Sequence, residues 1–224
     1  VLDADLSAST KTAVFAKAFP DRFFDTGIAE GNMMSVAAGL AASGKIPFAS
    51  TFAVFGAGRA YEQIRNSICY PNLNVKVAVT HAGLTVGEDG ATHQMLEDIA
   101  LMRALPNMTV VVPADAAETA QVIRWAASYQ GPVYIRMGRA KVEDVISPDA
   151  EFVPGKSTTL ADGSDVTLMA CGIMTQQALQ AAKMLAEKGI SARVINMSSI
   201  KPIDEAAIVK AAKETGAIVT CEEH

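Results

Sequence analysis

The sequence has few cysteines, few aromatic residues and no long apolar run. Its three cysteines, Cys69, Cys171 and Cys221, are too few and too scattered for a disulfide framework or a zinc site. No apolar stretch reaches the roughly eighteen residues that a membrane helix needs, and the first residues do not resemble a signal peptide. Lysine and arginine form no cluster and the net charge is −5, which argues against a nucleic-acid surface. We therefore expect a cytoplasmic protein with reduced thiols that binds neither nucleic acid nor membrane.

What the sequence does contain is a large apolar fraction in alternating patterns. Half of the 224 residues are hydrophobic, which suffices for one sizeable core or two modest ones. Strand and helix patterns alternate over the first 140 residues, and this predicts a parallel sheet covered on both faces. In this part we expect strands at 22–25, 47–51, 75–79, 109–112 and 133–136, and helices at 32–43, 58–67, 95–105 and 116–129.

The pattern divides the chain into two α/β domains. We assign residues 1–142 to the parallel-sheet domain, residues 143–164 to a linker rich in charge, proline and glycine, and residues 165–224 to a smaller open α/β domain. In the smaller domain we expect strands at 166–170, 192–197 and 217–220, and helices at 174–188 and 204–215. The chain opens without methionine and closes on a strand pattern, so we expect these residues to be part of a longer polypeptide.

The stretch richest in chemical groups is Thr80–Gln94, which follows the predicted strand 75–79. It contains His81, His93 and the adjacent pair Glu88 and Asp89, with three glycines between them. Glycine allows a backbone to approach a ligand closely, and histidine exchanges a proton near neutral pH. Ligands of α/β proteins bind where strands end, so we favour a catalytic loop. The alternative is a polar surface turn whose histidines face water.

Three further features each allow two interpretations. Glu30, at the entry to an apolar helix, either complements the helix dipole or shares a proton with a ligand nitrogen. Phe52 and Phe55, three residues apart, either pack in the core or form a wall for a flat ring. The serines near the N-terminus, Ser7 and Ser9, are explained as helix caps unless a ligand binds there.

Taken together, the motifs resemble the C-terminal half of transketolases. They are G-I-A-E, T-F-x-x-F and T-H-x-x-x-x-V-G-E-D-G-x-T-H-Q, in that order, extended by D-A-D-L-S-A-S near the start and P-A-D after residue 112. The resemblance covers nearly the whole chain, and the stretch G-E-D-G-x-T-H-Q is highly specific. It implies an enzyme that uses thiamine diphosphate and a divalent metal to move a two-carbon ketol unit between sugar phosphates, as in the pentose phosphate pathway.

The resemblance also implies a cofactor site in this chain. Glu30 is similar to the family's carboxylate, which hydrogen-bonds the aminopyrimidine ring and so favours the tautomer that deprotonates the thiazolium carbon. Phe52 and Phe55 resemble the aromatic wall around the pyrimidine, and Asp5 is similar to a polar residue near the cofactor. Gly58 stands where many transketolases have a tyrosine, so part of this pocket is filled differently.

A substrate site is implied in the same way. His81 is similar to a histidine near the ketose hydroxyls, Asp89 to a carboxylate that senses a substrate hydroxyl, and His93 to a histidine near the phosphate side or the carbonyl. Ser9 and Arg139 match positions that bind the sugar phosphate, for which guanidinium geometry is well suited. Glu30, His81 and His93 are thus the expected catalytic residues.

One signature of the family is missing from the sequence. The G-D-G motif and the asparagine pair that hold the diphosphate and the Mg²⁺ or Ca²⁺ ion do not occur in it. The resemblance therefore implies the C-terminal subunit of a split transketolase, active with an N-terminal subunit that binds diphosphate and metal, in an α2β2 heterotetramer. A segment of a full-length enzyme would contain the same residues.

Three rival interpretations remain. 1-Deoxy-D-xylulose-5-phosphate synthases share G-I-A-E and a D-G-x-T-H loop, but usually carry arginine in place of His81 and lack a residue equivalent to Glu88. The β subunit of a 2-oxo acid dehydrogenase lacks the T-H-Q loop. A non-catalytic assembly or regulatory partner would not need to retain Glu30, both loop histidines, Asp89 and Arg139 together.

Overall fold

The chain folds into two compact units. The computed structural model describes residues 1–224. The first unit comprises residues 1–110 and 126–140 with His224, and the second comprises residues 111–125 and 141–223. Helix α6 (Ala116–Ser128) is divided between them. None of the helices combines the length and the apolar character that crossing a membrane requires.

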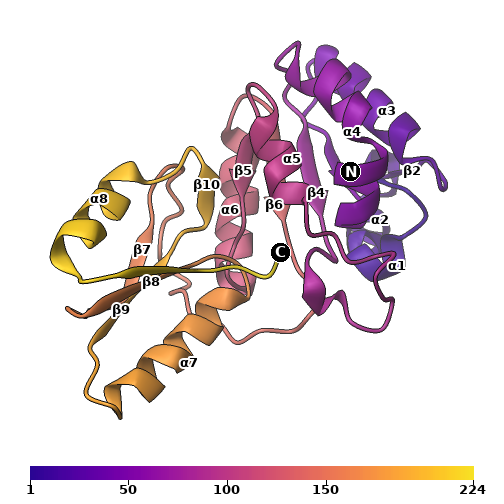
Figure 1. Ribbon diagram of the computed structural model, residues 1–224. Helices are drawn as coiled ribbons and strands as arrows, with labels where there is room; N and C mark the ends of the chain where they lie inside the picture. Colours follow the sequence, from indigo (N-terminus) through magenta and orange to yellow (C-terminus); the bar gives the residue numbers. More distant parts are fainter. The chain divides into compact units, whose positions relative to one another are not determined.

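The larger of the two sheets has seven strands, in the order β10-β5-β6-β4-β3-β1-β2 (Figure 1). Strand β4 pairs in parallel with β3 and β6, and β1 pairs in parallel with β2 and β3. The predicted α/β class with a parallel sheet is thereby confirmed. The strands are β1 (Leu2–Asp3), β2 (Phe24–Asp25), β3 (Phe48–Ser50), β4 (Lys76–Val79), β5 (Thr109–Val111), β6 (Val133–Arg136) and β10 (Ser199–Lys201).

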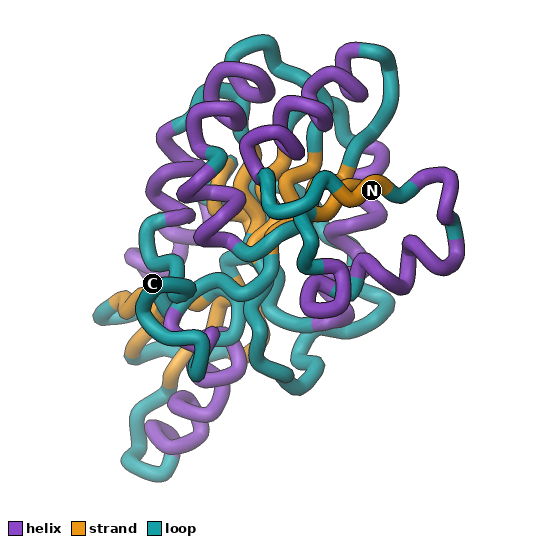
Figure 2. The backbone as a smooth tube through the Cα atoms, turned by 90° about the vertical axis from the view of Figure 1, so that its right-hand side faces the viewer, coloured by secondary structure: helices purple, strands orange, loops and turns teal.

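Short helices connect the strands of the first unit and flank them, as Figure 2 shows in purple beside the orange strands. Helix α3 packs against β1 and β3 and against α4. The helical segments of this unit are α1 (Ser7–Thr10), α2 (Thr12–Ala18), η1 (Pro20–Arg22), α3 (Glu30–Ala42), η2 (Val54–Arg59), α4 (Tyr61–Gln63), η3 (Ile64–Cys69), η4 (Leu84–Val86) and α5 (Asp98–Ala104).

Helix α3, predicted at 32–43 as an apolar helix, is buried on one side only. Met33, Met34 and Ala37 are fully buried, whereas Val36 on the other side is 39% exposed. Because its residues are small and apolar on every side, the sequence pattern does not reveal which face the chain covers. The strand predicted at 22–25 is also only partly correct, since β2 is two residues long and Phe24 is half-exposed.

The helix predicted at 58–67 belongs to a longer and less regular segment. Residues 54–69 form a π-helical turn (η2), one short α-helical turn (α4) and a second π-helical turn (η3). The wide turn shows in the bond from Ala60 N to Phe55 O, five residues back. Similarly, the helix predicted at 95–105 begins only at Asp98. Both differences lie next to the loop Thr80–Gln94 or the aromatic pair.

Strand β4 leads into that loop and is buried along its whole length. Its one charged residue, Lys76, has three acceptors for its ammonium group: Asn74 Oδ1 at 2.6 Å, Tyr129 O at 2.8 Å and Gly131 O at 2.7 Å. Burial lowers the pKa of Lys76 to about 8, so the side chain keeps its proton at neutral pH. A charge in this strand is tolerated because all its donors are bonded.

The second unit contains a four-stranded sheet in the order β11-β8-β9-β7. Strand β7 pairs antiparallel with β9, and the other pairs are parallel. Helix α7 packs on β8 and β9, around a core that includes Leu168, Ala178 and Val194. The elements are β7 (Thr158–Ala161), β8 (Val166–Ala170), α7 (Met174–Ala186), β9 (Ala192–Asn196), α8 (Glu205–Glu214) and β11 (Ile218–Cys221).

The sequence predicted this unit's other elements but missed strands β7 and β10. Both are short, and β7 lies at the sheet edge with a register shift between Thr159 and Ala161. Strands of this kind bury too little apolar surface to give an alternating pattern. The cysteines are free thiols as expected, with Cys69 and Cys171 buried and Cys221 partly buried.

A buried polar network ties helix α5, just after the loop, to strand β6. Asp98 Oδ2 accepts a hydrogen bond from Tyr134 Oη at 2.7 Å and one from Arg136 Nε at 2.8 Å. The side chains of Asp98 and Arg136 are 0% and 3% exposed. Since a buried carboxylate needs a cation and hydrogen-bond donors, this network fixes the end of the loop on the sheet.

Replacing Asp98 by alanine should destabilise the protein strongly. The change removes the buried carboxylate that accepts hydrogen bonds from Arg136 Nε and Tyr134 Oη, and breaking a buried ion pair typically costs about 3 to 5 kcal/mol. Urea unfolding followed by circular dichroism measures this, with Asp21→Ala, at an exposed aspartate, as the control. A loss below about 1 kcal/mol for Asp98→Ala would contradict a structural role for the network.

Candidate active site

The loop Thr80–Gln94 folds tightly at the carboxyl end of β4. Gly83, Gly87 and Gly90 all adopt positive φ angles, between 78° and 80°. Gly83 N donates to Met95 O, and Gly90 N donates to Gly87 O, so the loop doubles back on itself. A side chain at Gly87 would be strained and would meet Arg139 Nη1 at 3.5 Å. The expectation of a tight loop that needs glycine is confirmed by these angles.

His81 is the first residue of the loop to leave the strand, and two neighbouring side chains hold its ring. Its ring stacks on Phe52 with centroids 3.7 Å apart and an angle of 16° between the planes. Nδ1 is 2.9 Å from Thr80 Oγ1, and the side chain is 8% exposed. The backbone φ of 57° is unfavourable for a residue other than glycine, which is a feature typical of functional sites.

The environment of His81 favours its neutral form. Burial lowers the pKa of the imidazole most, and the positive charges of Arg139 and Lys11 and the nearby His93 lower it further, against the opposing charge of Asp89. With Nδ1 engaged by Thr80, Nε2 is the nitrogen left for a ligand. A neutral imidazole of this kind can donate or accept one hydrogen bond at neutral pH.

His93 joins the same aromatic group from the far end of the loop. Its ring lies edge-on to Phe55, 5.4 Å between centroids, and to Phe52, 6.5 Å between centroids. Its Nδ1 is 2.9 Å from Thr92 Oγ1. Phe52 and Phe55 are themselves nearly parallel, at 11° and 6.0 Å. Two histidines and two phenyl rings therefore lie together, although 26 positions separate Phe55 from His81 along the chain.

Glu30 lies at the start of α3 with its carboxyl group 1% exposed. Its Oε2 accepts a hydrogen bond from Arg59 Nη1 at 2.8 Å, and the Arg59 guanidinium carbon lies 4.4 Å from the centre of the Phe55 ring. The carboxyl group thus adjoins the aromatic group through Arg59 and Phe55. Its backbone position is close-packed, because a Cβ at the next residue, Gly31, would meet Gln63 Oε1 at 3.2 Å.

Arg139 follows strand β6 and bonds the loop Thr80–Gln94. Its Nη1 donates to Val86 O at 2.6 Å, and its Nη2 forms an ion pair with Glu88. That pair raises the pKa of Arg139 and lowers the pKa of Glu88, chiefly through the hydrogen bond between them. Asp89 is exposed, and its charge acts on both Arg139 and His81.

The remaining predicted residues lie in the N-terminal turn. Asp5 and Ser9 are exposed, and Asp5 has a φ of 63° with its N donating to Asp25 Oδ1 at 3.1 Å. The turn is built on the fully buried Asp3, whose Oδ2 accepts from the hydroxyls of Thr10 and Thr12. No direct contact joins Ser9 or Asp5 to the histidines, although Lys11 in this turn is close enough to affect His81 electrostatically.

Sequence reasoning missed Arg59 as a partner of Glu30. Arg59 falls in the helix predicted at 58–67, and its spacing of four residues from Phe55 places both on one helical face. That spacing was the available signal. The contact with Glu30, which is 29 residues away along the chain, was not readable from a local pattern.

The geometry suits a flat, nitrogen-containing ring better than a metal ion. The buried carboxyl group of Glu30 is linked through Arg59 to the parallel aromatic rings. His81, which is buried, and His93, which is partly buried, adjoin these rings. Such a set can hydrogen-bond and stack a heterocycle and position the hydroxyls of a second ligand. No three His, Cys, Asp or Glu side chains of residues 1–224 come together as a metal site.

Comparison with known families agrees with the fold. The chain matches the family model "Transketolase, pyrimidine binding domain" over residues 1–144 and "Transketolase, C-terminal domain" over residues 155–224. This defines a protein built from the pyrimidine-binding and C-terminal domains found together in thiamine-diphosphate enzymes. The chain belongs to the transketolase family.

Several similar proteins are named as sections or subunits of transketolases. The chain is 55% identical, over its whole length and 71% of the relative, to the "Putative transketolase C-terminal section" of Methanocaldococcus jannaschii. It is 44% identical to the "6-deoxy-6-sulfo-D-fructose transketolase subunit SqwH" of a Clostridium species, over 99% of the chain and 69% of the relative. It is also 41% identical, over 35% of the relative, to the 1-deoxy-D-xylulose-5-phosphate synthase of Desulfotalea psychrophila.

Solved structures give the same assignment. A structure described as "Split gene transketolase, inactive beta4 tetramer" superposes with a TM-score of 0.92 at 64% identity, over the whole chain and 72% of that structure. Transketolase from Campylobacter jejuni superposes with a TM-score of 0.86 at 26% identity, over 99% of the chain and 36% of that structure. The chain is thus similar to subunits of divided enzymes along its full length and to a fraction of undivided ones.

The lowered pKa of His81 predicts how stability depends on pH. The unfolded chain takes up a proton on this histidine near pH 6.5, whereas the folded protein takes it up only at lower pH. The free energy of unfolding should therefore fall as the pH drops below 6.5. His81→Asn should make the decrease shallower, because asparagine takes up no proton in this range. Thermal melts between pH 5 and 7 test this; identical slopes for wild type and His81→Asn would contradict it.

Proposed function

We propose that this chain is the C-terminal part of a transketolase and binds the pyrimidine end of thiamine diphosphate. In this proposal it works with a separate N-terminal subunit that holds the diphosphate and a Mg²⁺ or Ca²⁺ ion, in an α2β2 assembly. The single observation that supports it best is the Glu30 side chain, which is 1% exposed and bonded to Arg59, the arginine that lies over the Phe55 ring. The names of the split relatives, one of them called a C-terminal section, support the divided subunit.

The residues present fit the pyrimidine end of the cofactor. A buried carboxyl group can hydrogen-bond a ring nitrogen, and the parallel rings of Phe52 and Phe55 can form the wall of its pocket. Thiamine diphosphate, when bound, would supply a thiazolium carbon that, once deprotonated, can act as the nucleophile toward a ketose carbonyl group. Glu30 holds the proton that this chemistry needs at the pyrimidine ring, so we assign it the first catalytic role.

The histidines and the loop form the proposed substrate site. His81, neutral and stacked on Phe52, offers Nε2 to the ketose hydroxyls, and His93 stands at the other side of the rings. Asp89 is exposed beside them for a substrate hydroxyl. Arg139 and Ser9 are the proposed phosphate ligands; Arg139 has to exchange its bond to Glu88 for a phosphate oxygen in this role. Asp5 is proposed to lie near the cofactor.

The proposal also covers the substrates, the pathway and the cellular location. We propose transfer of a two-carbon unit from a ketose phosphate to an aldose phosphate, a step of the pentose phosphate pathway, in the cytoplasm. Relatives named for sulfofructose and for apulose 4-phosphate argue that subunits of this kind vary in the sugar they take. We also propose a pyrimidine-binding domain at 1–142 and a C-terminal domain from 165, near the limits of the two family matches.

A second candidate activity is that of 1-deoxy-D-xylulose-5-phosphate synthase. It is favoured by the identity of 41% to the Desulfotalea psychrophila enzyme over the whole chain. His81 and Glu88 favour transketolase instead. The synthases usually carry arginine in place of His81, and they lack a residue equivalent to Glu88. Formation of 1-deoxy-D-xylulose 5-phosphate by the assembled protein, without ketol transfer, identifies the synthase.

The isolated chain should be inactive, and its partner should restore activity. We expect no transfer from xylulose 5-phosphate to ribose 5-phosphate by this chain alone, because it has no diphosphate and metal signature. Mixing it with the subunit encoded by a neighbouring G-D-G-bearing reading frame should give ketol transfer in a coupled assay. Full activity of the isolated chain would refute the division of the site.

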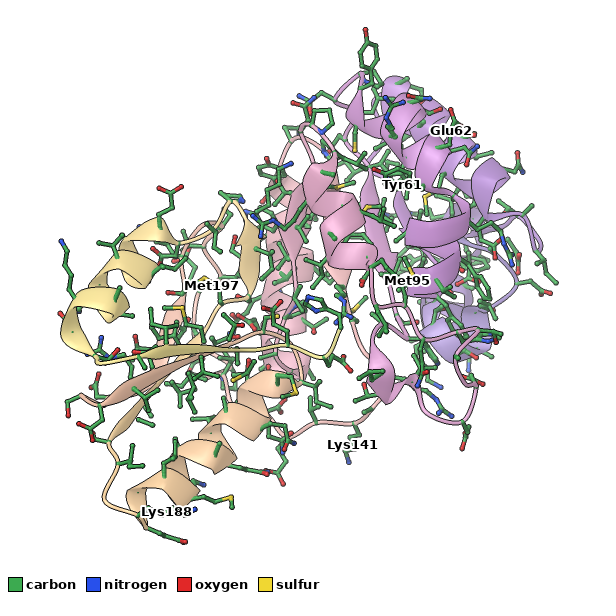
Figure 3. All side chains as sticks on the ribbon, in the orientation of Figure 1. Tyr61, Glu62, Met95, Lys141, Lys188 and Met197 are labelled. Atoms are coloured by element: carbon green, nitrogen blue, oxygen red, sulfur yellow. The ribbon has the colours of Figure 1, made fainter.

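Replacing Glu30 by glutamine should reduce ketol transfer by the assembled protein at least about 100-fold, because the amide cannot deliver the proton. The variant keeps the shape of the side chain, so its thermal melting temperature checks that it is folded. Glu62→Gln is the matched control, since Glu62 lies on the exposed side of α4 (Figure 3). Turnover of Glu30→Gln within threefold of wild type means that Glu30 has no catalytic role.

A further inference from the structure

Arg59 bonds Glu30, the residue that we propose binds the pyrimidine ring of the cofactor. Its Nη1 lies 2.8 Å from Glu30 Oε2, and its guanidinium carbon lies 4.4 Å from the centre of the Phe55 ring. The Glu30 carboxyl group is 1% exposed, whereas the Arg59 side chain is 51% exposed. Arg59 therefore reaches from the surface to a buried acid, which its guanidinium group bonds.

The tip of Arg59 has the chemistry of an aminopyrimidine edge. A guanidinium group is planar, carries N–H donors around a C–N framework, and lies flat on aromatic rings. An aminopyrimidine is also planar, presents N–H donors when its ring is protonated, and stacks on the same kind of ring. In this chain one such group already occupies the two partners, Glu30 and Phe55, that a pyrimidine would use.

The local structure fixes the direction of Arg59. It is the last residue of the π-helical turn η2, four residues after Phe55. The turn is pressed against the sheet at Gly56, where a Cβ would meet Val79 Cγ1 at 2.9 Å. At Gly58 a Cβ would come only within 3.8 Å of Met95, an ordinary contact, so a larger residue is not excluded here. The helical backbone is thus fixed, and the side chain of Arg59 is what can move.

We propose that Arg59 is a placeholder for the aminopyrimidine: it neutralises Glu30 and covers Phe55 until thiamine diphosphate displaces it. Rotation of the half-exposed side chain into solvent is enough for the exchange, with no change in the backbone. The buried carboxylate then passes from one N–H donor to another and is never left without a partner, which would be costly. This inference rests on the proposed function, because it assumes that Glu30 receives the pyrimidine ring.

Competition between Arg59 and the cofactor can be measured as binding. Isothermal titration of thiamine diphosphate with Mg²⁺ into the assembled two-subunit protein gives the dissociation constant. Arg59→Ala should tighten it about fivefold, the effect expected of one half-exposed ion pair that no longer has to be broken. Arg65→Ala is the matched control. Arg65 is an exposed arginine in η3, and its guanidinium group donates to Asn66 Oδ1.

Unfolding without added cofactor gives a second readout. Arg59→Ala should lower the melting temperature, because Glu30 loses its cation, and saturating thiamine diphosphate should raise it by more than it raises the wild type. In a Glu30→Gln background, Arg59→Ala should change neither value. Arg59→Met, which keeps the apolar stem, replaces the alanine variant if that variant does not fold.

The outcomes separate the two proposals. Unchanged binding of thiamine diphosphate in Arg59→Ala and Arg59→Met overturns the proposal that Arg59 is a placeholder. Weaker binding overturns it too, and means that Arg59 helps to hold the cofactor. If the placeholder proposal is overturned but Glu30→Gln has lost ketol transfer, the proposed function still stands. If Glu30→Gln transfers ketol units normally, the proposed function itself fails, whatever the Arg59 variants do.

Discussion

A carboxylate removed from water is the constraint on which the rest of the site depends. Glu30 is almost completely buried at the start of α3, and a charge in that place needs a donor within hydrogen-bond distance. Arg59 provides one, and the surrounding elements hold both residues: α3 packs on β1 and β3, and η2 is pressed against β4 at Gly56. An acid so placed is costly to maintain, and such a cost is typical of residues kept for chemistry.

The second constraint is the end of strand β4, where the chain turns abruptly. His81 accepts a positive φ and stacks on Phe52, while the three loop glycines bring His93 back to the same rings. The Asp98 network holds the far side of this loop to β6. Strain in the loop is therefore supported by a rigid sheet, which is how a site keeps its side chains in position.

The parts that could be predicted from sequence are those with strong local patterns. The apolar run of β4, the glycines of the loop and the alternation of strands and helices predicted the sheet and the place of His81. The exposed side of α3 could not be predicted, because Val36 and Met33 are both apolar and only tertiary packing decides which is covered. The π-helical turns and the edge strand β7 likewise result from packing, and the pairing of Glu30 with Arg59 is a long-range contact.

A crystal structure of the assembled two-subunit protein with thiamine diphosphate and Mg²⁺ tests the central claim most directly. We predict a Glu30 carboxyl oxygen within about 3 Å of a pyrimidine ring nitrogen, the Arg59 guanidinium turned away from it, and the diphosphate held by the N-terminal subunit. A pyrimidine ring bound away from Glu30, or a diphosphate and metal bound wholly by this chain, would contradict it.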